Sequence, residues 1–290
     1  MNAINRSVMI TGSSGFLGRH VVRRFRAAGW KTISTVRVPR GVPGEVKLDF
    51  SHSAVLSDVS KLQACDAVVH LGTFVDFSEK AKPKDFFFTN EFAASVLSRL
   101  CLEWDARLLF VSGTLVYGEQ IYTDEDTKPR PNLPYGKAKF LAEQIFQNSG
   151  IKNTILRPSG IFGYQGPGHL GINTAISRAI NNNEVPVCVG GGTAKRNYIY
   201  VKDLAKVIYY CVSNEINGVH IAAGREVISI GKMLEIICNV FLPGCQKQIR
   251  TGNEGRHVVA EHSKLLPIGR GFRESIEDIQ VCLDDRGVLR

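Results

Sequence analysis

The sequence predicts an α/β protein in which a doubly wound parallel sheet carries helices on both faces and a smaller C-terminal α/β lobe follows. Two observations lead to this fold class. Short apolar runs, typical of buried strands, alternate with segments in which apolar residues recur at helical spacing. The first apolar run, Val8 to Ile10, leads directly into a glycine-rich turn and a helical pattern. Strands that alternate with helices pair in parallel, because each connection crosses the sheet as a helix.

The first half of the chain shows this alternation most clearly. Strands are predicted at 8–10, 31–36, 46–49, 66–72, 107–112 and 153–158. Helices are predicted between them at 19–28, 55–62, 83–103 and 133–146. Gly29 is a stop signal for the first helix, and Pro158 ends the last of these strands.

Three glycines separate the first strand from the first helix. Gly12 permits a tight turn, Gly15 lets backbone N–H groups approach a phosphate, and Gly18 lets the helix pack on the strand. Phe16 and Leu17 stand in this turn, ahead of the helix, whose N-terminus supplies partial positive charge. This strand–turn–helix layout predicts a dinucleotide-binding site at these residues, with an ordinary βα turn as the alternative.

The pattern loosens after Pro158. Helices are predicted at 172–180, 203–211 and 230–241, and strands at 185–189 and 219–222. We therefore expect a dinucleotide-binding domain of the Rossmann type at 1–160, to which the chain returns near 195–225. Residues 161–290 are expected to form mainly a substrate-binding lobe.

Composition places the chain among globular proteins of sufficient size for a large core. It has 290 residues, of which 44% are hydrophobic and 22% charged. No apolar stretch is long enough to span a bilayer, and the N-terminal residues lack an apolar signal region. These features predict a cytoplasmic protein without a membrane partner.

Charge and cysteine content narrow the possible partners. The formal net charge is +9, but the basic residues are spread along the chain, which favours an enzyme that handles anionic phosphates over a nucleic-acid-binding protein. The seven cysteines are scattered, none of them in Cys-x-x-Cys spacing. Reduced core thiols are therefore expected, with no disulfide framework and no metal site.

The residues after the second and third strands bear on the cofactor. A carboxylate at the end of the second strand would select NAD, but Arg37 and Arg40 stand there instead. Because a guanidinium matches a phosphate, we expect NADP, with NAD less favoured; the alternative is two solvated loop arginines. Asp49 and Phe50 are expected beside the adenine, where Asp49 could accept from the amino group or could cap a helix.

Tyr135 and Lys139 lie four residues apart at the start of a predicted helix, so they share one face. A free phenol has a pKa near 10 and is a poor acid or base at neutral pH. A nearby lysine cation favours the phenolate and lowers that pKa, which would give a tunable proton donor beside a carbonyl. An ordinary surface pair is the alternative.

A series of motifs covers most of the chain. In order they are Thr11-Gly12-x-x-Gly15-x-x-Gly18, Val69-His70-Leu71-Gly72-Thr73, Asn90, the segment 112–118 ending in Val116-Tyr117-Gly118, Tyr135-x-x-x-Lys139, Leu156-Arg157-Pro158, Arg196 to Ala205, and Gly269-Arg270-Gly271-Phe272. With these motifs the chain resembles the extended short-chain dehydrogenase/reductases, within the NAD-dependent epimerase/dehydratase group that acts on nucleotide sugars.

The resemblance implies a role for each matching position. Tyr135 would be the catalytic acid/base, and Lys139 would hold the nicotinamide ribose and lower the tyrosine pKa. Arg196 would contact the diphosphate of a nucleotide sugar. Ser112 and Asn90 would be mainly structural. Further contacts to the cofactor would come from Leu71, Gly72, Thr73, Pro158 and Ile161.

The resemblance also implies an assembly. The predicted helices at 85–103 and 133–146 are similar to those that pair two subunits into a four-helix bundle in this family. A homodimer is therefore expected.

Two positions depart from the family pattern. Gly113 stands where the family usually has Ser or Thr, four residues before the Tyr of Val-Tyr-Gly. Thr114 is then the candidate for a replacement hydroxyl at the substrate carbonyl. Gly160 stands where a sugar-nucleotide-binding Asn is frequent.

The main functional hypothesis is an NADPH-dependent reductase of a nucleotide-linked 4-keto-6-deoxy sugar, with the proton supplied by Tyr135. An NAD-dependent nucleotide-sugar epimerase is the main alternative. Dehydration is disfavoured, because Leu115-Val116 stands where the resemblance leads one to expect Asp-Glu. Reduction of a non-sugar carbonyl and a non-catalytic NADPH-binding protein remain open, as do the identities of the base and the sugar.

Overall fold

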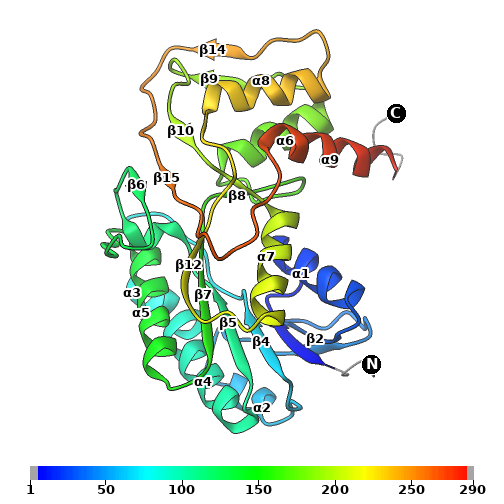
Figure 1. Ribbon diagram of the computed structural model, residues 1–290, viewed down its shortest axis with the longest axis vertical. Coiled ribbons are helices and arrows are strands. Elements are labelled where there is room, and N and C mark those ends of the chain that lie inside the picture. Colours follow the sequence, from blue (N-terminus) through cyan, green and yellow to red (C-terminus); the bar gives the residue numbers. More distant parts are fainter. Residues whose placement is uncertain (1–5, 286–290) are drawn as a thin grey trace. The chain divides into compact units, whose positions relative to one another are not determined.

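The computed structural model describes residues 6–285 (Figure 1). The chain divides into two compact units, each built from segments that are distant in sequence. The first unit comprises Met1–Glu119, Thr127–Arg157 and Ala205–His220, and the second comprises Gln120–Asp126, Pro158–Leu204 and Ile221–Arg290. Each unit is described separately below.

A seven-stranded sheet forms the centre of the first unit, in the order β12-β7-β5-β4-β1-β2-β3. The neighbouring strands from β7 to β3 all pair in parallel, which confirms the doubly wound prediction. The strand order reverses between β1 and β4, and ligands of sheets of this type bind outside the carboxyl ends of the strands at such a switch point. The strands are β1 (Ser7–Thr11), β2 (Lys31–Val36), β3 (Glu45–Lys47), β4 (Ala67–His70), β5 (Arg107–Val111), β7 (Asn153–Pro158) and β12 (Gly218–Ala222).

Helices cover both faces of this sheet. Figure 1 shows α1 (Phe16–Ala27) and α7 (Val201–Ser213) on one face and α4 (Ala93–Trp104) and α5 (Pro134–Asn148) on the other. Beneath α4 and α5 lies a core cluster of apolar side chains from helices and strands, including Met9, Val68, Leu97, Leu108, Phe110 and Phe146. The short helix α2 (Val55–Val59) ends before residue 62, where the sequence predicted its end.

The helix expected at 83–103 is interrupted. It consists of α3 (Pro83–Phe87), a π-helical turn η1 (Phe88–Phe92) and α4. Within this turn Asn90 is buried, and its Nδ2 donates to the Phe86 carbonyl at 3.0 Å. Thr73 Oγ1 donates to Asn90 Oδ1 at 3.2 Å. The side chain of Asn90 thus joins the helix to the segment after β4, which agrees with the structural role expected for it.

The second unit packs three helices with short strand pairs. The helices α6 (Gly171–Asn182), α8 (Ile230–Phe241) and α9 (Phe272–Asp284) each bury one apolar side. The strand pairs are β8 (Ile161–Phe162) with β11 (Ile199–Tyr200), β9 (Val187–Val189) with β14 (Gln248–Arg250), β10 (Lys195–Arg196) with β13 (Ile228–Ser229), and β6 (Tyr122–Thr123) with β15 (Val259–Ala260).

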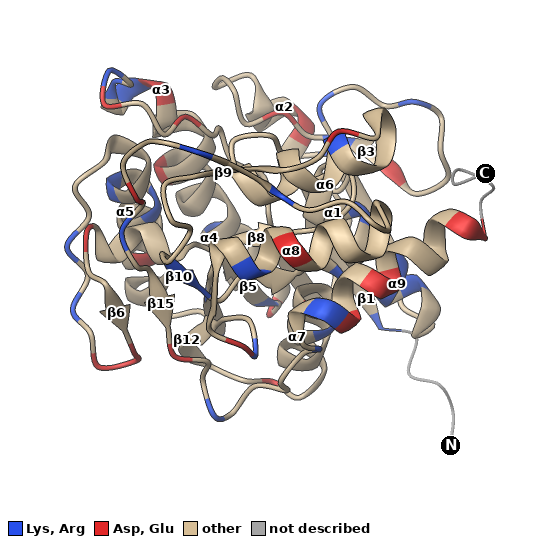
Figure 2. Ribbon diagram, turned by 90° about the horizontal axis from the view of Figure 1, so that it is seen from above, with Lys and Arg blue, Asp and Glu red and all other residues tan. Residues whose placement is uncertain are grey.

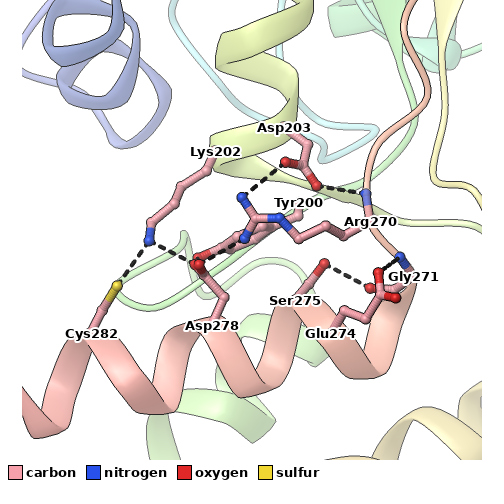
Figure 3. A network of polar contacts seen from close by, with 9 residues as sticks. All are labelled: Tyr200, Lys202, Asp203, Arg270, Gly271, Glu274, Ser275, Asp278 and Cys282. Atoms are coloured by element: carbon pink, nitrogen blue, oxygen red, sulfur yellow. Dashed lines mark hydrogen bonds and ion pairs between the residues drawn. The ribbon is translucent and has the colours of Figure 1, made fainter. Parts of the chain in front are cut away.

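A network of ion pairs ties α9 to the start of α7 within the second unit (Figure 3). Asp278 of α9 accepts from Lys202 at 2.6 Å, from Tyr200 at 2.8 Å and from Arg270 at 2.8 Å. Arg270 also meets Asp203, whose carboxylate accepts from the Arg270 backbone N–H at 2.9 Å. Lys202 and Arg270 are thus paired with the carboxylates of Asp278 and Asp203 where α9 packs against the start of α7.

The described residues show where the cysteines and the charged residues of the chain lie. All seven cysteines are free thiols, and five of them are buried. Basic and acidic residues are interspersed along the helices and loops (Figure 2). None of the helices within residues 6–285 combines the length and the apolar character that a membrane span requires.

Candidate cofactor and proton-transfer site

The glycine turn after β1 requires glycine at two positions. Gly12 has φ +64°, and a Cβ there would lie 2.8 Å from the Gly72 nitrogen. A Cβ on Gly18 would lie 2.1 Å from the Gly12 carbonyl oxygen, so only glycine lets α1 pack this closely on the turn. Gly15 N donates to that same carbonyl at 3.0 Å and closes the turn. The turns after β1 and β4 are therefore in direct backbone contact.

The N-terminus of α1 fits a pyrophosphate. Gly15 is its N-cap, no side chain caps it, and its first turn carries no acidic residue. The first N–H groups of a helix have no acceptor within the helix and carry partial positive charge. Phe16 and Leu17 supply two of these N–H groups. The predicted residues Gly12, Gly15, Phe16 and Leu17 therefore lie together at this turn.

The segment after β4 is held by a buried hydroxyl. Thr11 Oγ1 accepts from the backbone N–H groups of Leu71 and Gly72, both at 3.1 Å. It also bonds His70 Nδ1 at 2.7 Å. Burial lowers the pKa of His70 to about 3, so the ring is neutral and serves to orient Thr11. Leu71, Gly72 and the neighbouring Thr73 therefore lie beside the glycine turn, as predicted.

The residues expected at the adenosine end have different surroundings. Arg37 is exposed directly after β2, whereas Arg40 forms an exposed ion pair with Glu45 at 3.2 Å. Asp49 Oδ1 accepts from the Ser51 N–H at 3.0 Å, and this bond, with the His52 and Arg37 charges, outweighs partial burial and lowers its pKa. Because α2 begins at Val55, Asp49 does not cap that helix. Phe50 packs into the core at 8% exposure, and its place beside the adenine stays a prediction.

Tyr135 lies in the first turn of α5, beside the 3-10 turn η2 (Thr114–Tyr117). A Cβ on Gly136 would lie 2.7 Å from the Leu115 carbonyl oxygen, so glycine at this position brings α5 against η2. The Tyr135 ring is 9% exposed, with Phe77 at 4.9 Å and Phe86 at 6.1 Å between ring centroids. An aromatic wall therefore surrounds the phenol.

Lys139 is buried behind this tyrosine. Its Nζ donates to the Val111 carbonyl at 3.0 Å and lies 4.6 Å from the centre of the Phe110 ring and 5.9 Å from that of Tyr135. Burial lowers the pKa of Lys139 to about 7, while the Glu143 carboxylate acts in the opposite direction.

The pKa of Tyr135 shifts in the direction opposite to the sequence expectation. Burial raises the pKa of Tyr135 above its ordinary value, and Lys139 does not offset this effect. The reason is that Lys139 gives its hydrogen bond to Val111, and its own charge is disfavoured by burial. The phenol is thus held in its protonated form.

Gly113, where the family hydroxyl is missing, lies between two residues that carry a hydroxyl, Ser112 and Thr114. Gly113 has an extended backbone, with φ 176° and ψ 160°, and a Cβ there would meet no atom within 4 Å. Thr114 starts η2 and is half-buried. The Ser112 hydroxyl is buried without a hydrogen-bond partner among the described residues, and its backbone N–H donates to Leu156 at 2.8 Å.

The remaining predicted residues belong to the second unit. Pro158 is buried at the end of β7, and Ile161 is half-buried in β8. The Arg196 guanidinium donates to the carbonyls of Lys195 and Arg256. A Cβ on Gly160 would lie 2.3 Å from the Tyr198 ring, which therefore occupies the space that an Asn side chain would need.

The sequence prediction missed the groups that surround the Tyr135–Lys139 pair. Phe77 comes from a segment without periodicity, so nothing in the sequence placed it on Tyr135. Glu143, by contrast, continues the four-residue spacing of Tyr135 and Lys139 along α5, and this signal could have identified it. Its partner is Arg157, which also donates to the Tyr117 hydroxyl.

Comparisons with known proteins agree with this geometry. Residues 8–231 match the model of the NAD dependent epimerase/dehydratase family. A UDP-glucose 4-epimerase of Azospirillum brasilense is 28% identical over 233 residues, which are 70% of this chain and 67% of that protein.

Solved structures show the same fold. A UDP-N-acetylglucosamine 4-epimerase of Bacillus cereus superposes with a TM-score of 0.83 at 22% identity, covering 96% of this chain and 99% of the other. MoeE5, solved in complex with UDP-glucose and NAD, gives 0.81 at 23% identity, covering 97% and 99%. On the family match and the Rossmann fold together, this chain belongs to the NAD-dependent epimerase/dehydratase family, within the short-chain dehydrogenase/reductase class that its motifs resemble.

Proposed function

We propose that this chain is an NAD-dependent 4-epimerase of a nucleotide sugar. The observation that carries the proposal is the sequence match to UDP-glucose 4-epimerase over 70% of the chain. The family model at residues 8–231 covers both the glycine turn and the Tyr135–Lys139 pair. The epimerase alternative thereby takes precedence over the reductase favoured from the sequence, because the relatives from Azospirillum brasilense and Bacillus cereus named above are epimerases. MoeE5, with its bound UDP-glucose, supports a uridine diphosphate sugar as the first substrate to test.

In this proposal the chain's own residues manage one proton. When bound, the cofactor would supply hydride-acceptor and hydride-donor chemistry at the sugar carbon. Tyr135 would act in this step as the phenolate, a form favoured by the positive charges of Lys139 and of an oxidised nicotinamide over the phenol of the chain without cofactor. Its Oη takes the hydroxyl proton of that carbon during oxidation and gives it back to the same oxygen after the opposite face is presented. Lys139 holds the ribose of the cofactor and provides positive charge beside the phenol while its proton is away. No cofactor is consumed in the cycle.

For the cofactor we propose NAD, held by the glycine turn, the N-terminus of α1 and the segment from Leu71 to Thr73. The NAD bound to MoeE5 supports this assignment. Arg37 is the feature that favours NADP, because it is exposed at the end of β2 where a 2′-phosphate would lie. Dissociation constants for NAD and NADP, measured by titration calorimetry, decide between the two cofactors.

The decisive experiment is a conversion assay without added reductant. UDP-glucose and UDP-N-acetylglucosamine are incubated with the purified chain and NAD, and the 4-epimers are detected by proton NMR. We expect interconversion of at least one pair and no net change in reduced nicotinamide. Tyr135→Phe should lower the rate by about 100-fold or more while cofactor affinity stays within about twofold.

Other results would overturn the proposal. Stoichiometric oxidation of NADPH by a 4-keto nucleotide sugar, without epimer formation, would establish the reductase. An unchanged rate in Tyr135→Phe would remove Tyr135 from the mechanism. Tyr210→Phe is a matched control, because Tyr210 lies on α7, away from the glycine turn and α5.

A further inference from the structure

A buried ion pair lies one helical turn behind Lys139. Arg157 and Glu143 form a bidentate contact, with Nε to Oε1 at 3.1 Å and an Nη to Oε2 at 2.6 Å. Their side chains are only 7% and 0% exposed. The other Nη of Arg157 donates to the Tyr117 hydroxyl at 3.0 Å, and the guanidinium lies 5.0 Å from the centre of the Tyr117 ring.

The three residues join the three elements that carry the proposed chemistry. Tyr117 ends η2, the turn that begins with Thr114. Glu143 lies on α5, on the face that also bears Tyr135 and Lys139. Arg157 lies on β7 beside the β5 strand, whose Val111 accepts the hydrogen bond of Lys139.

Stability alone does not explain a charged pair at this place. Removing two charges from water costs several kcal/mol per ion, and well-packed apolar residues of similar volume frequently serve as well or better. Both Glu143 oxygens are occupied by Arg157, so the carboxylate lies close to Lys139 without drawing its Nζ away from Val111. The pair can therefore act on the charge of Lys139 and leave its position unchanged.

We propose that Glu143 is a positioning group that keeps Lys139 charged. Through Arg157, which also bonds Tyr117, it holds the turn η2 in place against α5. This inference rests on the proposed function only for its catalytic consequence. The effect on Lys139 itself is a property of the folded chain.

The surroundings of Lys139 support this assignment. Burial lowers the pKa of Lys139, and Glu143 is the group that raises it again. The other groups that face Lys139 are the Tyr135 phenol, which burial keeps protonated, and the His70 ring on β4, which burial keeps neutral. Phe110 contributes the face of its ring, and Arg157 is neutralised by Glu143. Glu143 is thus the anion that sustains the lysine charge.

The test is a direct titration of Lys139 by NMR in full-length protein labelled at the lysine ε-carbon, with the signal assigned through Lys139→Met. Two variants are compared with the wild type. Glu143→Gln removes the anion and leaves Arg157 charged, whereas Glu143→Leu/Arg157→Met replaces the pair with apolar residues. The double variant is expected to fold, because no uncompensated charge remains. Glu277→Leu/Arg273→Met is the matched control, an exposed Arg–Glu pair on α9 that receives the same two substitutions.

We expect the titration midpoint of Lys139 to fall by about half a pH unit or more in the double variant, further in Glu143→Gln, and not in the control. The alkaline limb of the epimerisation rate should move to lower pH in the same order. Tyr117→Phe should lower kcat without moving the midpoint, because it frees η2 and leaves the carboxylate in place. A folded double variant with the wild-type midpoint would overturn the inference. If the midpoint shifts but no nucleotide sugar is epimerised, the inference stands and the proposed function fails.

Discussion

At the scale of single residues, the site is defined as much by absent side chains as by reactive ones. Backbone contacts leave no room for a side chain at Gly12 and Gly18. Gly113, by contrast, has an extended backbone and faces open space. The backbone does not require glycine at 113. Instead of the family's hydroxyl at that position, this chain has hydroxyls on either side of it, with Ser112 buried and Thr114 at the start of η2. Thr114 is the hydroxyl that we assign to the substrate oxygen.

This assignment predicts a loss and a rescue. Thr114→Val should lower kcat about 10- to 100-fold, because a hydrogen bond to a charged or developing oxyanion contributes about 1.5–3 kcal/mol. Adding Gly113→Ser to that variant should restore much of the rate, since the extended backbone and the empty space accept a serine without strain. Steady-state kinetics on the single and double variants measure both effects. A Thr114→Val enzyme with the wild-type kcat would show that this hydroxyl takes no part.

At the scale of elements, sequence patterns located the strands of the seven-stranded sheet, most helices and the glycine turn, but not the short strand pairs of the second unit. Apolar runs and the glycine spacing predicted β1, α1 and their turn, because burial and close approach both restrict residue type there. The π-helical turn at Phe88–Phe92 arises from a side-chain amide in contact with a distant threonine, which no local pattern can report. The aromatic side chains around Tyr135 are also brought there by tertiary contacts. The raised pKa of the phenol follows from the burial that these contacts produce.

The contact between α1 and the glycine turn gives a prediction for that element. Gly18→Ala would place a methyl group 2.1 Å from the Gly12 carbonyl, so the helix must move away from the turn. Overpacking of this kind costs about 1–3 kcal/mol, and we expect a lower melting temperature together with at least about tenfold weaker cofactor binding. Calorimetric titration with NAD and with NADP measures the affinity.

Gly171→Ala provides the comparison for that variant. Gly171 lies in α6 with nothing within 4 Å of a Cβ, so alanine there should keep cofactor affinity and slightly raise stability. Equal affinities in Gly18→Ala and the wild type would contradict the role given to the turn.

At the scale of the whole molecule, each unit is built from segments that are distant in sequence. The boundary predicted after residue 160 lies close to Pro158, where the second unit resumes. The segment Gln120–Asp126 belongs to that unit because β6 pairs with β15, far along the chain. Two-residue strands carry no periodic signal, so this pairing required the structure.

The helical face of the first unit predicts an oligomer. Phe87, Leu102 and Leu141, on α3, α4 and α5, are 47%, 58% and 50% exposed, and apolar surface of this kind marks interaction sites. A two-fold axis that pairs the same helices of two copies would bury these side chains in a four-helix bundle. We expect twice the chain mass of 32.0 kDa in sedimentation equilibrium and a concentration-dependent melting temperature. Leu141→Glu should give monomers, while Val281→Glu, at a position on α9 that is 58% exposed, should stay dimeric. A wild-type chain that sediments as a monomer at every concentration would exclude this interface.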